Sequence, residues 1–114
     1  MSLATIERKQ LLAAVLGNRN VSTVDVGEIT LGASQRAGRH LHPCAVVGYI
    51  ASGTAIYQIE GEPIQTLPVG SAFYEPANTV IAEFGNASED AQLTFIAFYL
   101  LDGEQELITM LETR

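Results

Sequence analysis

Two histidines stand two residues apart, in the order His40-Leu41-His42, and they are the only histidines in the chain. In a β-strand, residues i and i+2 point to the same face, so both imidazoles can converge on one point. Imidazole nitrogens are common ligands of divalent transition metals, and the spacing therefore suggests a metal site. The pattern is short, and it also fits a pair of histidines that is partly buried or faces solvent.

The charged residues are distributed unevenly along the chain. Its 114 residues include 6 Lys and Arg against 13 Asp and Glu, which gives a net charge of −7. From His40 to Thr113 there is no Lys or Arg at all, although ten of the acids lie there. Nucleic acids and anionic membranes are bound by clustered Lys and Arg, so the composition argues against both partners. A site built from this stretch has no arginine clamp for phosphate, but it can attract a cation.

The compartment is predicted from the N-terminal residues, the lack of a long apolar run and the number of cysteines. The first ten residues carry charges where a signal peptide needs an apolar stretch, and no run approaches the roughly 18 apolar residues of a membrane span. The single cysteine, Cys44, has no partner for an intrachain disulfide. We therefore expect a cytoplasmic protein that does not cross a membrane.

The hydrophobic pattern predicts one all-β domain with short helices at its ends. Apolar residues with helical spacing in residues 1–20 stop at Gly17-Asn18, which predicts a short N-terminal helix or turn of helix. Across residues 21–101 the period changes to two, and turn residues separate many short runs, as in an antiparallel barrel. Residues 102–114 form a tail in which acids precede apolar residues, a pattern that fits a second short helix.

Two segments resemble the sequence motifs of the cupin superfamily. Residues 38–53 contain the His-x-His pair and, at Gly53, the glycine that closes the first motif. Residues 68–86 begin with Pro-Val-Gly and end in Asn86, as the second motif does, and Tyr57–Pro63 matches the hairpin between the motifs. The resemblance covers about residues 21–101 in order and spacing. It implies a double-stranded β-helix, or jelly-roll barrel, to which the apolar spacing adds short helical segments at the termini.

The resemblance also implies a metal site, from which this chain departs at two positions. Metal-binding cupins supply two histidines and a glutamate from the first motif and a third histidine from the second. His40 and His42 match the pair, whereas the glutamate position falls at Val46 and the last histidine position at Ile81. Because stable sites usually have three or more protein ligands, two imidazoles alone would hold a divalent ion poorly.

Glu75 is the best candidate for a third ligand, because it stands just before Pro76 in a strand that enters the second motif. A carboxylate there either joins the histidines inside the barrel or faces solvent. Two histidines and one carboxylate would suit Fe, Mn, Ni or Zn with positions open for a substrate. The remaining residues expected in the pocket are Cys44, ranked below Glu75 as a ligand, Val46, Gln58, Ile81 and Glu83.

Three hypotheses for the function follow. The first is a small-molecule-binding cupin with a divalent metal at His40, His42 and Glu75, which supports dioxygenase, isomerase or decarboxylase chemistry. The second is a non-catalytic, metal-free binding or sensing module, in which Val46 and Ile81 mark a lost metal centre. The third is a mainly structural role as a dimer-forming module. We also expect a homodimer, with the apolar residues 93–101 as its interface.

Overall fold

The computed structural model describes residues 5–112, and within them the chain forms strands and no helix. The strands are β1 (Thr23–Leu31), β2 (His40–Leu41), β3 (Ala45–Ser52), β4 (Ala55–Ile59), β5 (Gln65–Leu67), β6 (Ala72–Glu75), β7 (Ile81–Asn86), β8 (Leu93–Leu101) and β9 (Thr109–Met110). Turn residues separate the strands as the sequence predicts, with glycines at positive φ such as Gly53 and Gly61.

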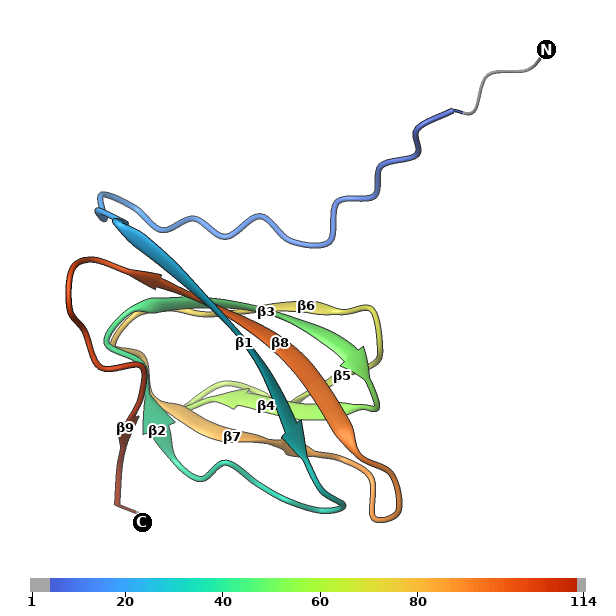
Figure 1. Ribbon diagram of the computed structural model, residues 1–114. Coiled ribbons are helices and arrows are strands. Elements are labelled where there is room, and N and C mark those ends of the chain that lie inside the picture. The colour runs from blue at the N-terminus through green and yellow to red at the C-terminus, as the bar shows by residue number, and fades with distance from the viewer. Residues whose placement is uncertain (1–4, 113–114) are drawn as a thin grey trace.

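The strands form two antiparallel sheets that face each other as layers (Figure 1). One sheet has four strands in the order β1-β8-β3-β6, and the other has five in the order β5-β4-β7-β2-β9. Neighbours in a sheet are distant in sequence, as where β1 pairs with β8 over its whole length. This arrangement places the apolar face of each sheet against the other, and the predicted all-β class is confirmed.

Alternation along the long strands builds the space between the sheets. In β8, for example, Leu93 and Ala97 are buried, and Phe95 and Tyr99 pack against the core from the same face. The core contains a group of aromatic rings with centroids 4.9–6.1 Å apart. Such pairs stabilise a core beyond the apolar area that they bury. They come from β4, β6, β7 and β8, at Tyr57, Phe73, Phe84 and Phe95.

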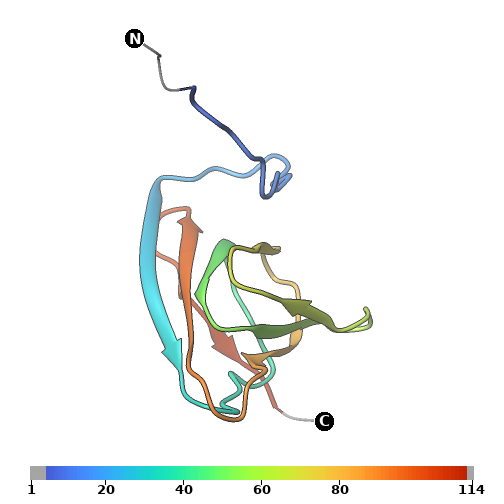
Figure 2. The same ribbon diagram turned by 90° about the vertical axis from the view of Figure 1, so that its right-hand side faces the viewer.

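The predicted N-terminal helix is wrong for residues 5–20, and residues 1–4 lie outside the described residues. Both ribbon views show this segment running past the four-stranded sheet without forming a helix, and its first described residues lead away from the strands (Figures 1 and 2). A short amphipathic helix is stable only when its apolar face is packed. Here Ile6 is 76% exposed and Val15 86% exposed. Leu11 and Leu12 line a pocket with Val47, Tyr49 and Phe98 on the outer face of the four-stranded sheet, but both leucines stay exposed, so the contact does not bury an apolar helix face.

The predicted C-terminal helix in residues 102–114 is also wrong where the chain is described, to residue 112. The segment turns back after β8, and β9 pairs with β2 through His40 and Met110. Pairing with the free edge of β2 satisfies backbone groups that an isolated helical turn would leave to water. The described residues contain no helix that is long and apolar enough to span a membrane.

Gly48 on β3 supports the aromatic core by having no side chain. A Cβ atom added at this position would overlap the ring of Phe73 on β6. We expect Gly48→Ala to lower the free energy of unfolding by about 1–3 kcal/mol, because the buried ring must move. Gly27→Ala on β1 is the matched control, since its Cβ would meet no heavy atom closer than 3.8 Å. Urea unfolding curves that give equal losses for the two variants would contradict this account.

Candidate metal centre

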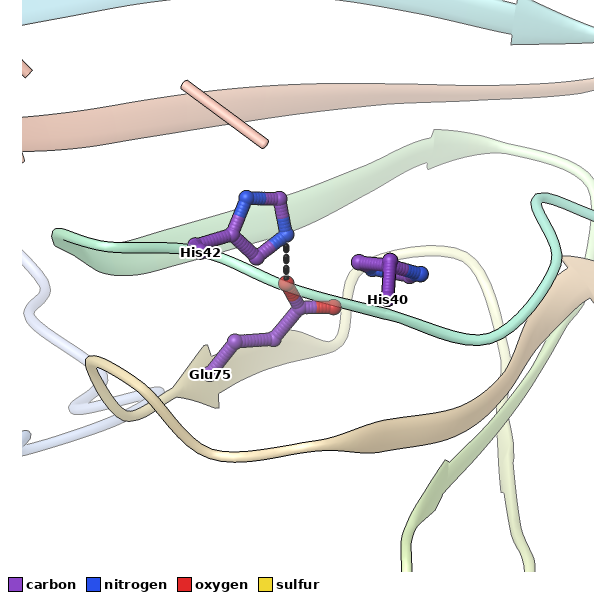
Figure 3. Close-up of side chains that lie close together, drawn as sticks. All are labelled: His40, His42 and Glu75. Atoms are coloured by element: carbon purple, nitrogen blue, oxygen red, sulfur yellow. Dashed lines mark ion pairs between the residues drawn. The ribbon is translucent and has the colours of Figure 1, made fainter. Parts of the chain in front are cut away.

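The two histidines come from one short segment at the edge of the interior. His40 lies in β2 and His42 follows this strand, so the chain places both side chains on its inward face. They are 3% and 5% exposed, and their ring centroids lie 4.9 Å apart. Figure 3 shows both rings beside the carboxylate of Glu75. The convergence expected from the spacing is therefore present.

The backbone orients each imidazole through its Nδ1 atom. His40 Nδ1 lies 2.7 Å from the carbonyl oxygen of Gly38, and His42 Nδ1 lies 2.6 Å from that of Leu107. A carbonyl only accepts hydrogen bonds, so each Nδ1 carries the proton and donates. In the neutral ring the lone pair is then on the other nitrogen, Nε2. Metal-binding histidines are held in this tautomer by the same kind of hydrogen bond.

Glu75 brings a carboxylate to the histidines from the neighbouring sheet. It ends β6 and is 3% exposed, and its Oε2 atom lies 2.5 Å from Nε2 of His42. In the pairing of β3 with β6, Glu75 stands directly opposite Val46. Residues directly opposite each other in an antiparallel pair share a face. The carboxylate is therefore supplied one strand away from the position where the cupin motif would place it.

A proton must lie between His42 and Glu75 in the metal-free protein. Nδ1 of His42 already donates to Leu107, so Nε2 of a neutral ring and an ionised carboxylate would oppose two lone pairs. Burial acts to lower the pKa of His42, but the hydrogen bond to Glu75, its negative charge and the Leu107 carbonyl together raise it. The buried imidazolium is thus stabilised by its partner.

The residues present fit a divalent transition metal. The potential ligand atoms of His40, His42 and Glu75 all lie within 4.8 Å of one another, and all three residues are buried. Two imidazoles and a carboxylate form a donor set that suits Fe, Mn, Ni or Zn. Ile81, where the cupin motif has a further histidine, is completely buried in the hydrophobic core and offers no ligand.

A cavity of about 220 Å³ adjoins the three residues. Its wall is mostly aliphatic and aromatic, and it receives residues from both sheets. The lining residues are Ile29, Leu31, Ala37, His40, His42, Val46, Phe73, Glu75, Phe84, Phe95, Ala97, Tyr99 and Ile108. The ring of Tyr99 lies 5.8 Å from that of His42. Burial and then the negative charge of Glu75 raise the pKa of Tyr99, so its hydroxyl stays protonated.

The other expected pocket residues have different places. Val46 lines the cavity as expected. Cys44 and Ile81 are completely buried in two separate core clusters, and neither belongs to the lining. Gln58 donates to the carbonyl of Glu62, outside the lining. The Glu83 side chain is 43% exposed and pairs with Arg36 at 3.4 Å.

The C-terminal segment contributes to the site in a way that the sequence patterns did not indicate. Leu107 orients His42 through its carbonyl, and Ile108 lines the cavity while remaining 41% exposed. Ile108 therefore lies where the cavity meets solvent. A backbone carbonyl leaves no signature in the residue type, so the only available signal was a run of apolar residues after the last long strand.

Solved structures with similar folds identify the architecture, whereas no family model and no curated protein matches the chain. A cupin-like protein from Thermotoga maritima superimposes with a TM-score of 0.68 at 24% identity, covering 77% of this chain and 64% of that one. The DMSP lyase DddQ from Ruegeria pomeroyi gives 0.66 at 18% identity, covering 76% of this chain. The chain spans only 42% of that lyase.

A third structure is similar in length to this chain. An RmlC-like cupin family protein with a double-stranded β-helix fold, from Methanocaldococcus jannaschii, has a TM-score of 0.60 at 21% identity. The match covers 68% of this chain and 69% of that protein. Together with the two facing sheets, these likenesses confirm the cupin fold that the sequence motifs predict: the chain is a double-stranded β-helix of the cupin type.

Proposed function

We propose that the chain binds one divalent transition metal through His40, His42 and Glu75 and uses it to hold a small molecule in the adjoining cavity. The observation that supports this most directly is the convergence of three buried donor groups at the wall of an apolar cavity. Burying two imidazoles and a carboxylate costs free energy unless a partner compensates for it, as the His42–Glu75 pair does without metal and a bound cation would do with it.

The residues of the chain have separate roles in this proposal. A bound metal acts as a Lewis acid toward an oxygen of the ligand. Glu75 and the Nε2 atoms of the histidines hold the ion, while the Gly38 and Leu107 carbonyls keep the rings in the required tautomer. The aromatic wall excludes water, which strengthens electrostatic interactions at the site.

Metal-assisted chemistry of the dioxygenase or isomerase type is the activity that this arrangement supports best. Both reactions can use a metal that holds an oxygen-bearing substrate, and Glu75 would serve either as a ligand of the ion or as the general base beside it. A lyase reaction can also use a metal and a carboxylate placed in this way, and some proteins of similar fold are named DMSP lyases. These reactions are proposed for this chain from its own donor set.

Metal analysis tests the proposal. Purified protein is stripped with a chelator, exposed to Fe, Mn, Ni or Zn salts in turn, desalted and analysed for metal content. We expect about one equivalent of at least one metal per chain. Uptake below about a tenth of an equivalent for all four would contradict the proposal, because three buried ligands normally retain a transition ion.

Zinc should stabilise the protein more as the pH rises from about 6 to 8. The pKa of His42 is raised above 6.5, so the protonated pair with Glu75 stabilises the metal-free protein fully below pH 6.5 and less as pH rises through that pKa. Metal binding instead needs the neutral imidazole. The difference in Tm between zinc-loaded and chelated protein measures the sum of both effects. A difference that does not change with pH would contradict this assignment.

A non-catalytic, metal-free binding module is the second candidate. It is favoured by Val46 and Ile81, which leave apolar side chains at two positions where the cupin motif has ligands. In that case a ligand would raise the Tm of the protein equally with and without a chelator. A rise in Tm that the chelator removes would support the metal-dependent function instead.

We also propose that the chain forms a homodimer through the outer face of the four-stranded sheet. β8 lies between β1 and β3, so its edges are already paired and a partner can reach only its outward side chains, of which Phe98 lies beside residues 10–14 of the N-terminal segment. Next to it, Val24 and Val26 on β1 are about half exposed, as expected of a face that a partner covers. Light scattering at micromolar concentration should give twice 12.2 kDa, and a monomer mass would contradict the dimer.

A further inference from the structure

The polar groups of the cavity are gathered at one end. His40, His42 and Glu75 lie together, and the Tyr99 ring is next to that of His42. Every other lining side chain is aliphatic or a phenylalanine. A ligand that placed a second polar group against this wall would lose its hydrogen bonds to water without replacing them. The ligand must therefore carry its polar atoms on one side only.

The charge of the site limits the charge of the ligand. Two neutral imidazoles, one carboxylate and a divalent ion give a net charge of +1. No Lys or Arg lines the cavity. The two arginines nearest in sequence to the histidines, Arg36 and Arg39, are paired with Glu83 and Glu60. A monoanion would neutralise the loaded site, whereas a dianion or a cation would leave an uncompensated charge in an apolar surrounding.

The volume of the cavity limits the size of the ligand. An apolar protein cavity of about 150 Å³ accepts a benzene molecule. The cavity here is about 220 Å³, which leaves space beyond one ring for a head group of only a few atoms. Drug-sized ligands are bound in pockets of about 300–1,000 Å³, so the part of the ligand that this cavity encloses is smaller than a drug-sized molecule.

We propose that the cavity binds a small monoanion that has one metal-chelating head and one uncharged hydrophobic body about the size of a single ring. This inference rests on the proposed function, because the head binds the metal held by His40, His42 and Glu75. The aromatic wall formed by Phe73, Phe84 and Phe95 receives the body. Phosphate esters, dicarboxylates and sugars are excluded as ligands by the same arrangement.

A matched set of probes tests the proposal on zinc-loaded protein by calorimetry. Benzohydroxamate chelates zinc as a monoanion and carries a phenyl ring, whereas acetohydroxamate has the same head with only a methyl group. We expect benzohydroxamate to bind about 10- to 100-fold more tightly, because the ring buries more apolar area. A carboxylate at the 4-position should remove that advantage, and benzamide, which lacks the chelating anion, should bind at least about 10-fold more weakly than benzohydroxamate.

Each outcome of this experiment decides the proposal. Equal affinity for the two hydroxamates, or for benzohydroxamate and its 4-carboxylate, would show that the apolar wall does not select the ligand and would overturn it. In both cases zinc uptake, measured first, would leave the proposed function standing. Failure to take up any metal would overturn the function and the inference together.

A substitution in the wall locates the binding of the body. Ala97 on β8 lines the cavity and is almost completely buried, so Ala97→Leu would fill part of the space that a ring requires. We expect this variant to bind acetohydroxamate as the unchanged protein does and benzohydroxamate at least about 10-fold more weakly. Ala97→Val is the milder version of the same change. Equal weakening of both probes, or of neither, would contradict the placement of the ring.

Discussion

Replacing Glu75 with glutamine should lower the affinity for zinc by at least about 100-fold. The amide keeps the shape of the side chain but has no negative charge, and it leaves the ion with two imidazoles as strong ligands. The effect should be larger than that of a change outside the ligand set. A competition titration against a coloured zinc chelator measures the affinity directly.

Glu83→Gln is the matched control for this substitution. Glu83 is also a strand glutamate, but it is exposed and pairs with Arg36 at the surface. Its replacement removes the same charge from the chain and should leave zinc affinity within about twofold, because surface ion pairs are weak. Equal affinities of Glu75→Gln and the unchanged protein would contradict the proposed metal centre. They would favour the metal-free binding module, for which Glu75 is dispensable.

The strands and the histidine pair could be predicted because their signals are local. The period of two in residues 21–101 and the turn residues between short runs are properties of neighbouring residues. The inward direction of His40 and His42 follows from the same period. The position of Glu75 could not be predicted from local signals, because its place beside His42 depends on the pairing of β3 with β6. The sequence did not predict that pairing, so the carboxylate was expected either inside the barrel or facing solvent.

Strand parity failed to place Gln58 and Glu83 for a physical reason. The register between β4 and β7 shifts between Gln58 and Ile59. Ala82 is the extra residue, so Ile81 and Phe84 are both buried although they are three positions apart. Such a bulge turns the residues on either side of it to opposite faces from those that strict alternation predicts. Glu83 consequently lies near the surface instead of the cavity.

The two terminal segments were predicted as helices because their apolar spacing fits a helix. Spacing shows which face would be buried if a helix formed, but the tertiary structure decides whether a partner surface exists. Residues 10–14 lie beside the outer face of the four-stranded sheet, but Leu11 and Leu12 stay exposed there, and the C-terminal segment pairs with a strand edge instead. That edge belongs to β2, the strand that carries His40. The incorrect helix prediction therefore concerned a segment that lies next to the candidate metal centre.

A chain that ends at Glu106 should bind zinc about 10- to 100-fold more weakly than the full chain. The deletion removes the Leu107 carbonyl, which accepts the hydrogen bond from Nδ1 of His42, and it removes β9 from the edge of β2. The imidazole is then free to rotate and to change its tautomer. The two sheets otherwise keep their strands, so circular dichroism should change little while the competition titration shows the loss.

A chain that ends at Glu112 is the matched control, since it keeps the Leu107 carbonyl, β9 and the hydrogen bond from Arg39 to the carbonyl of Glu112. It should bind zinc as the full chain does. Ile108→Ala separates the two contributions of the segment: it keeps the carbonyl that orients His42 but shortens the side chain at the cavity mouth. We expect this variant to retain zinc affinity and to release benzohydroxamate faster. Unchanged zinc affinity in the chain that ends at Glu106 would show that the sheets alone orient His42.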